Sequence, residues 1–206
     1  GSEFVIICVE TPTGPNGDAD MHYVDSAAIS IAKNMTAPLI VINKSTVPVG
    51  TGDRVAEKIK ESQPLAIDFS VVSCPEFLRE GAAVIDFKEP PYTVIGSFDQ
   101  QSGDQFEKLY LKISAPTYHV SLEEAESLKI VNNAFHSLKI RLANEISRFS
   151  NIFNIDSTKI MKLVCADTKL NISPAYLKPG YAFGGSCLPK DLRSLNFLSN
   201  KNEVKV

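Results

Sequence analysis

The chain has 206 residues, a formal net charge of −3 and an isoelectric point near 5.7, with 44% hydrophobic and 22% charged residues. This length suits one large domain or two small ones built around a real core. The lack of a broad basic charge argues against nucleic acid or an anionic membrane as the main partner.

Short apolar runs and widely spaced cysteines indicate a cytoplasmic protein. A run such as Val5–Val9 is far shorter than the ~20 residues that cross a bilayer, so we expect no membrane span. The four cysteines, Cys8, Cys74, Cys165 and Cys187, form no Cys-x-x-Cys pair. This spacing argues against a zinc site or a disulfide scaffold and favours a reducing compartment. We expect Cys8 and Cys165 to be buried structural residues.

The first two thirds of the chain alternate β-rich runs with helical segments, which is typical of βαβ units around a mainly parallel sheet. Residues 1–4 resemble a cloning scar, because a buried-type strand follows with no start methionine and no lead-in. The predicted strands lie at about 4–9, 38–43, 68–73, 92–96 and 117–120, and the predicted helices at about 23–34, 51–62 and 100–112. The loop at 11–18 follows the carboxyl end of the first strand, where open α/β sheets bind ligands.

A long helix of roughly 30 residues begins after Ser121, which stands in capping-box spacing with Glu124. Its apolar positions recur at helical spacing, so we expect one broad buried face that also packs on another chain or domain. These positions are Leu128, Val131, Phe135, Leu138, Leu142, Ile146 and Phe149. A second helix is predicted at about 156–166 and a last one near Pro189, after a loop rich in proline and glycine.

Cys187 is a candidate nucleophile because it stands on a glycine-rich turn just before a predicted helix. The helix dipole and the neighbouring Lys190 both favour the thiolate form. The alternative is a buried structural cysteine.

Lys129, Asn133 and His136 form one polar stripe on the long helix. A cation beside an amide donor could stabilise an oxyanion, and the alternative is a solvated helix face.

Two stretches that follow predicted strands carry further candidates. Glu76 and Glu80 stand at helical spacing, which could hold a general acid or base. The alternative is a capped helix start with both charges in solvent. The stretch 44–50 includes Thr46, whose hydroxyl could contact a cofactor, and the alternative is a plain strand-to-helix turn.

Taken in order, five motifs resemble the UDP-glucose/GDP-mannose dehydrogenase family. They are Val-x-Thr-Pro at 9–12, Ser-Thr-Val-Pro at 45–48, Pro-Glu-Phe-Leu-x-Glu at 75–80, Lys-x-x-x-Asn at 129–133 and Gly-Gly-Ser-Cys-x-x-Lys-Asp at 184–191. The resemblance implies an α/β fold in which residues 5–120 form the C-terminal part of a Rossmann-like NAD-binding domain with a parallel sheet. Residues 121–206 would form an all-helical central domain that makes a homodimer through the long helix at 121–153.

The resemblance also implies a chemistry: a four-electron oxidation of a sugar C6 alcohol to a carboxylate with two NAD+. Cys187 would attack the C6 aldehyde to give a thiohemiacetal, and the second oxidation would leave a thioester. Lys129 and Asn133 would hold the C6 oxygen, while Glu76, Thr46 and Asp191 would position water or move protons. The cofactor contacts implied are Thr11, Thr46 and Lys190.

The stretches 169–180 and 183–191 resemble the GDP-mannose branch more than the UDP-glucose branch. By the same matching the nucleotide-sugar site would be lined by Glu80, Lys129, Asn133, His136, Tyr176, Lys178, Tyr181 and Gly184, with Asn144 reaching the site of a partner subunit. UDP-glucose is the alternative substrate, and a non-catalytic dimerisation module that retains the motifs by descent is the alternative of another class.

The sequence contains no Gly-x-Gly-x-x-Gly turn, which in this family cradles the NAD pyrophosphate. We therefore expect the chain alone to bind NAD and substrate poorly and to have negligible activity.

Overall fold

The computed structural model describes residues 2–177, 179–180 and 187–201, and of the last three of these residues only the backbone. The chain divides into two compact units, Gly1–Asn133 and Ala134–Val206. The division falls inside one continuous helix, α5 (Leu122–Ile152). The two units are described separately below.

The first unit is built on a five-stranded sheet whose strands follow chain order. Neighbouring strands pair in parallel except β3 and β4, which are antiparallel, so the predicted mainly parallel sheet is confirmed. The strands are β1 (Phe4–Ile7), β2 (Leu39–Asn43), β3 (Phe69–Ser73), β4 (Thr93–Ser97) and β5 (Thr117–Val120). All five lie where the sequence predicts them, although β1 ends two residues earlier than expected.

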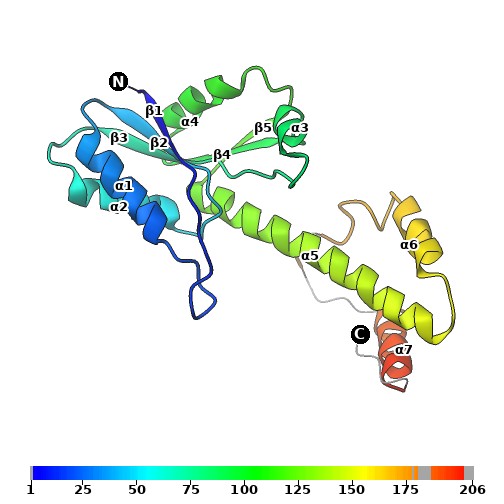
Figure 1. The fold of residues 1–206 in the computed structure, drawn as a ribbon. Helices are drawn as coiled ribbons and strands as arrows, with labels where there is room; N and C mark the ends of the chain where they lie inside the picture. Colours follow the sequence, from blue (N-terminus) through cyan, green and yellow to red (C-terminus); the bar gives the residue numbers. More distant parts are fainter. Residues whose placement is uncertain (1, 178, 181–186, 202–206) are drawn as a thin grey trace. The chain divides into compact units, whose positions relative to one another are not determined.

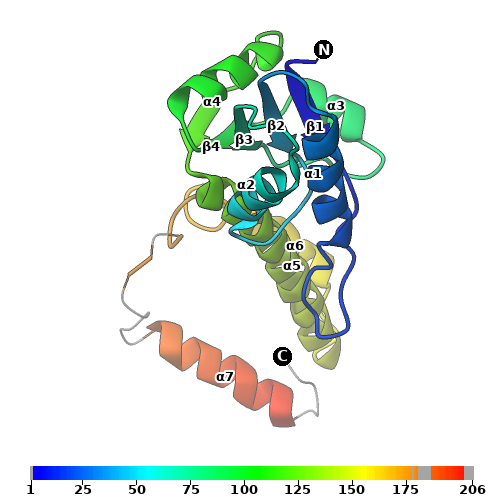
Figure 2. The ribbon, with the colours of Figure 1, turned by 90° about the vertical axis from the view of Figure 1, so that its left-hand side faces the viewer.

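Helices cover both faces of this sheet (Figures 1 and 2). The helices α1 (His22–Asn34) and α2 (Thr51–Ser62) pack on one face, and α4 (Gln100–Glu107) packs on the other. A 3-10 turn at Lys108–Tyr110 completes the segment predicted as a helix at 100–112. The short helix α3 (Ala83–Lys88) was not predicted.

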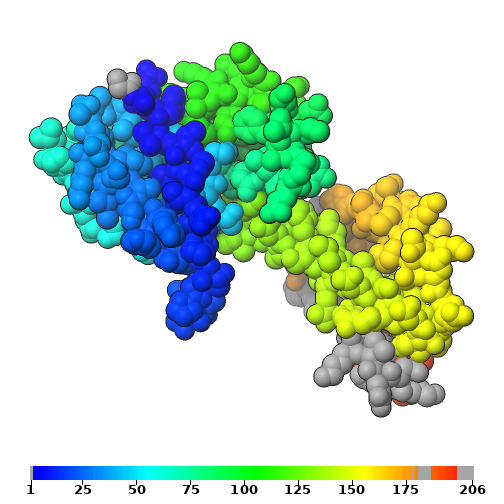
Figure 3. Space-filling model, viewed as in Figure 1, coloured from blue at the N-terminus to red at the C-terminus, as the bar shows by residue number. Residues whose placement is uncertain are grey.

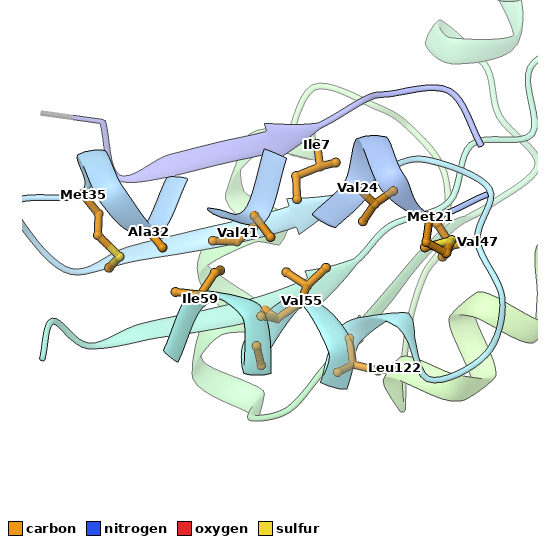
Figure 4. Packing of buried hydrophobic residues seen from close by; sticks show 13 residues of the cluster. Ile7, Met21, Val24, Ala32, Met35, Val41, Val47, Val55, Ile59 and Leu122 are labelled. Atoms are coloured by element: carbon orange, nitrogen blue, oxygen red, sulfur yellow. The ribbon is translucent and has the colours of Figure 1, made fainter. Parts of the chain in front are cut away.

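The alternation of side chains along β2 supplies a core to each face. Val41 points into a cluster that contains Val24 of α1 and Val55 of α2 (Figure 4). Its neighbour Ile42 points into a second cluster with Phe106 of α4. Burial on both faces explains why the central strands read as continuous apolar runs rather than alternating ones.

The first turns of α5 pack closely against the sheet. The capping box is confirmed, because Ser121 N donates to Glu124 Oε2 at 2.8 Å and Glu124 N donates to Ser121 Oγ at 3.2 Å. A Cβ on Gly96 would lie 2.7 Å from Ala125 Cβ, and a Cβ on Gly52 would lie 2.8 Å from Leu122 Cδ1. Both glycines are therefore needed for this approach.

The expected buried face of α5 is only partly buried within the single chain: Leu128, Ile146 and Phe149 are half-buried. Val131, Phe135, Leu138 and Leu142 are all exposed. Helical periodicity identifies an apolar face but does not say what covers it, so the pattern correctly grouped these side chains and misjudged their burial.

The second unit contains α6 (Ser157–Ala166) and α7 (Cys187–Lys201) besides the remainder of α5. The helix α6 lies where the sequence predicts it, and Asp156 caps it by accepting hydrogen bonds from Thr158 N at 3.0 Å and Lys159 N at 3.2 Å. The last helix begins at Cys187, two residues before Pro189. In the part of the chain that the structure describes, no helix is both long and apolar enough to cross a membrane.

The expected burial of two cysteines is also wrong. Cys8 and Cys165 are exposed, whereas Cys74 is buried. Cys8 directly follows β1, which lies at one end of the strand order and so leaves one side unpaired among the described strands. Cys74 directly follows β3, which lies inside the sheet.

An ion pair fastens the segment after β3 to α3. Arg79 Nη2 lies 2.7 Å from Asp86 Oδ1, and the Arg79 N and Nε groups donate to Asp86 Oδ2 at 2.9 and 3.0 Å. These hydrogen bonds from Arg79 lower the Asp86 pKa from its usual 3.8 to about 2.

We therefore predict that Asp86→Asn removes an acid-dependent part of the stability. Because the folded state lowers this pKa, the contribution is present above pH 4 and is lost as the pH falls through the window from 3.8 to about 2. Urea unfolding of the wild type and of Asp86→Asn between pH 6 and pH 2 measures this contribution. The difference between their free energies of unfolding should shrink as the pH falls. The matched control is Asp53→Asn, at an exposed carboxylate in α2. A difference in free energy of unfolding between the wild type and Asp86→Asn that stays constant over this pH range would contradict the prediction.

Candidate active site

Three loops meet at the carboxyl ends of the parallel strands β1, β2 and β3. Ser45 Oγ donates to Val9 O at 2.7 Å and accepts from Val9 N at 2.9 Å, which joins the loops after β1 and β2. Thr11 Oγ1 donates to Thr46 O at 2.7 Å. Two of the predicted cofactor-binding residues, Thr11 and Thr46, are therefore brought together.

The pairing of the strands places the start of α5 near the carboxyl ends of β2 and β3. Ser73, the last residue of β3, pairs with Asn43 of β2 and with Gly96 of β4, and Gly96 pairs with Val120 of β5. Since α5 follows Val120 after one residue, its first turns lie beside the ends of β2 and β3. Thr46 and Glu76 each stand three residues beyond a paired strand end.

Lys129 and Glu76, predicted from two separate motifs, form an ion pair. Lys129 Nζ lies 3.1 Å from Glu76 Oε1 and 5.5 Å from the centre of the Phe77 ring. Lys129 is only 8% exposed. An ammonium group that is held by a carboxylate and an aromatic ring has a fixed position, as a group that stabilises developing negative charge requires.

The expectation that Glu76 and Glu80 share a helical face is wrong. Residues 74–79 are not helical, and α3 begins only at Ala83. The Glu76 side chain turns back and accepts from Leu78 N at 2.5 Å, and Gly81 has a φ of 80°, which breaks any helix. Glu80 is exposed in this turn.

Glu126 is a buried member of the site that the sequence analysis missed. It is 2% exposed and accepts hydrogen bonds from Gly50 N and Gly52 N, each at 2.7 Å. Burial raises the pKa of the Glu126 carboxyl, and the backbone N–H groups at the start of α2 oppose that rise. Its position three residues before Lys129, on the same face of a predicted helix, is the signal that could have revealed it.

The other predicted residues of α5 continue along the same helix. Asn133 stands four residues after Lys129 and is the last residue of the first unit. His136 and Asn144 belong to the second unit and are exposed. The three residues of the predicted polar stripe, Lys129, Asn133 and His136, therefore lie on one uninterrupted helix, as expected.

Cys187 is exposed and is the first residue of α7. Lys190 and Asp191 follow near the start of the same helix and are exposed, with Lys190 Nζ 3.4 Å from Asp191 Oδ1. Tyr176 is exposed and has a φ of 64°, a left-handed conformation that is uncommon for a bulky residue. Three further predicted residues, Lys178, Tyr181 and Gly184, lie outside the described residues.

Comparisons with known proteins agree with the motifs. Residues 1–114 match the NAD binding domain of the UDP-glucose/GDP-mannose dehydrogenase family, and residues 123–206 match its central domain. GDP-mannose 6-dehydrogenase of Pseudomonas aeruginosa is 38% identical over 210 residues, which cover 99% of this chain and 48% of that protein. UDP-glucose 6-dehydrogenase TuaD of Bacillus subtilis is 38% identical over 194 residues, 94% of this chain and 42% of that protein. The chain thus spans about half the length of the curated relatives it matches.

Solved structures give the same answer. A ternary complex of GDP-mannose dehydrogenase from Pseudomonas aeruginosa superimposes with a TM-score of 0.94 at 38% identity, over 99% of this chain and 48% of that one. A UDP-glucose dehydrogenase from Pyrobaculum islandicum gives a TM-score of 0.79 at 34% identity, over 98% of this chain and 47% of that one. The matched domains account for nearly all of the sequence, and the chain belongs to the UDP-glucose/GDP-mannose dehydrogenase family.

Proposed function

We propose that this chain contributes the sugar-oxidising centre of an NAD-dependent nucleotide-sugar 6-dehydrogenase, with GDP-mannose as substrate and GDP-mannuronate as product. The observation that carries the proposal is the ion pair between buried Lys129 and partly exposed Glu76, at the same carboxyl edge of the sheet as Thr11 and Thr46. This edge is where open α/β sheets bind nucleotides and their substrates. In this proposal residues 5–120 belong to the NAD-binding domain and residues 121–206 to the central domain.

Lys129 and Asn133 are proposed to hold the C6 oxygen of the sugar. The Lys129 ammonium is already fixed by Glu76 and Phe77, so little reorganisation is needed when negative charge develops on that oxygen. Glu76 is more accessible than Lys129, with a side chain that is 32% exposed, which suits a group that exchanges a proton or holds a water.

Cys187 is the proposed nucleophile. Its sulfur adds to the C6 aldehyde to form a thiohemiacetal, oxidation of that carbon gives a thioester, and water then releases the carboxylate and restores the thiol. Cys187 is exposed and is the first residue of a 15-residue helix, so its sulfur is accessible to a substrate. Asp191, four residues later, is proposed to handle a proton together with Thr46 and Glu76.

The residues at the edge of the sheet fit a bound dinucleotide. Thr46 is exposed, and its backbone oxygen accepts from the Thr11 hydroxyl, which supports a shared role of these two residues at the carboxyl end of the sheet. We propose that Thr11, Thr46 and Lys190 contact NAD. When bound, NAD takes up the two electrons and the hydrogen that each oxidation removes from C6.

The substrate choice rests on the relatives and on the stretches 169–180 and 183–191. Six curated relatives named GDP-mannose 6-dehydrogenase are 38% or 39% identical to the chain. UDP-glucose is the second candidate, because TuaD is also 38% identical. The nucleotide-sugar contacts proposed besides Lys129 and Asn133 are Glu80, His136, Tyr176, Lys178, Tyr181 and Gly184, with Asn144 of a partner subunit. We also propose a cytoplasmic location.

A chimera tests the chemistry. The 206 residues replace the matching segment of the Pseudomonas aeruginosa GDP-mannose 6-dehydrogenase, and NADH formation is followed with GDP-mannose, UDP-glucose and no sugar. We expect two NADH per GDP-mannose and a loss of about a thousandfold or more in Cys187→Ser, because serine is a far weaker nucleophile. Cys165→Ser is the control at another exposed cysteine. A chimera that folds and binds NAD but oxidises neither sugar would refute the proposal, and preference for UDP-glucose would reverse the substrate assignment.

Thiol reactivity separates an enzyme from a non-catalytic module. Three of the cysteines, Cys8, Cys165 and Cys187, are exposed, so access alone does not distinguish them. We expect iodoacetamide at neutral pH to modify Cys187 first, because a catalytic nucleophile is activated by the groups of its site and a structural thiol is not. Peptide mass spectrometry over time gives the order. Equal, slow modification of all three exposed thiols would support the non-catalytic module instead.

The exposed face of α5 is the proposed homodimer interface. Leu138 lies on it and is 62% exposed. We predict that Leu138→Glu converts a dimer into a monomer in sedimentation equilibrium, because two carboxylates would be buried without partners. The control is Leu163→Glu on α6, at a leucine that is 74% exposed. A wild-type chain that is monomeric at high micromolar concentration, or a dimer indifferent to Leu138→Glu, would contradict this.

A further inference from the structure

Glu126 does not belong to any of the motifs that define the proposed site, yet it is a charged side chain placed inside the first unit. It is 2% exposed, and both of its carboxylate oxygens are used: Oε2 accepts from Gly50 N and Oε1 from Gly52 N, each at 2.7 Å. Removing a charge from water is costly, so such a residue is usually tied to a specific contact. Here the contact is the start of α2 and the end of the loop before it.

The loop that Glu126 holds is the one that carries Thr46. At its beginning, Ser45 is hydrogen-bonded to Val9 in both directions. At its end, Gly50 adopts a left-handed φ of 89° and donates to Glu126. Thr46 therefore lies between two anchored points, and the second anchor is supplied by α5.

The same face of α5 reaches the neighbouring loop one turn later. Lys129 stands three residues after Glu126, and its ammonium contacts Glu76 in the loop after β3. Strands β2 and β3 are adjacent and parallel, so their following loops lie side by side. One turn of helix thus joins the loop of Thr46 to the loop of Glu76.

We propose that Glu126 is a positioning residue: its carboxylate fixes the Thr46 loop relative to the Lys129–Glu76 pair and so sets the geometry in which the C6 oxygen is held. This inference rests on the proposed function. A carboxylate is required because two N–H donors converge on it. An amide at the same place offers one acceptor oxygen and turns an NH2 donor toward the second N–H.

The first test uses the chain itself. In Glu126→Gln we expect amide hydrogen exchange at Gly50 and Gly52 to accelerate about tenfold or more, since one buried donor loses its acceptor. We also expect the side-chain NMR signals of Lys129 to shift, because its helix turn is no longer held against the loop. Glu57→Gln, at an exposed carboxylate of α2, is the charge-matched control. Val24→Ala, on the buried face of α1, is the stability-matched control and should leave the Lys129 signals unchanged.

The second test uses the chimera. Glu126→Gln should lower kcat roughly tenfold or more through misplacement of the catalytic groups, while KM for the nucleotide sugar changes less than about twofold. Unchanged NMR signals of Lys129 or an unchanged kcat in Glu126→Gln would overturn the proposal. This holds even if Glu126→Gln lowers Tm as much as Val24→Ala does, because a loss of stability alone shows only a structural role. Should the chimera with Glu126 intact be inactive, the proposed function fails, and the NMR comparison alone then decides whether Glu126 links the two loops.

Discussion

The close approach of α5 to the sheet is the constraint on which the first unit depends. A Cβ on Gly96 would lie 2.6 Å from Ser121 O and 2.7 Å from Ala125 Cβ, so the sheet has no room for a side chain there, and Gly52 of α2 lies against the Leu122 side chain. Close packing of this kind fixes a helix in both position and rotation. The rotation decides the chemistry, because it turns Glu126 and Lys129 inward, toward the ends of β2 and β3.

The two inward charges are stabilised in different ways. Glu126 is stabilised by hydrogen bonds from the backbone N–H groups at the start of α2, where the helix dipole also favours an anion. Lys129 is matched by a carboxylate and lies over an aromatic ring. Glu76, whose side chain is partly exposed, is then the member of the pair that solvent reaches. The turns at 11–18, beside this edge, extend away from the sheet (Figure 3).

Much of this could be predicted from the sequence because its signals are local. Apolar runs gave all five strands, and the spacing of Ser121 and Glu124 gave the start of α5. The errors involve information that a pattern does not contain. Periodicity did not reveal that Phe135 and Leu138 are exposed in the single chain, and the spacing of Glu76 and Glu80 suggested a helix where Leu78 and Gly81 impose a turn. Contacts between distant segments, such as Lys44 Nζ to Tyr110 OH at 3.1 Å, leave no trace in spacing at all.

The central claim is that a nucleotide-sugar carbon becomes bonded to the sulfur of Cys187. The most direct measurement is mass spectrometry of the chimera after rapid acid quenching during turnover with NAD and GDP-mannose. The account predicts a peptide containing Cys187 that is heavier by the oxidised sugar nucleotide and that disappears on treatment with hydroxylamine, as a thioester does. An active chimera in which this peptide is never modified, or in which the added mass resides on another residue, would contradict it.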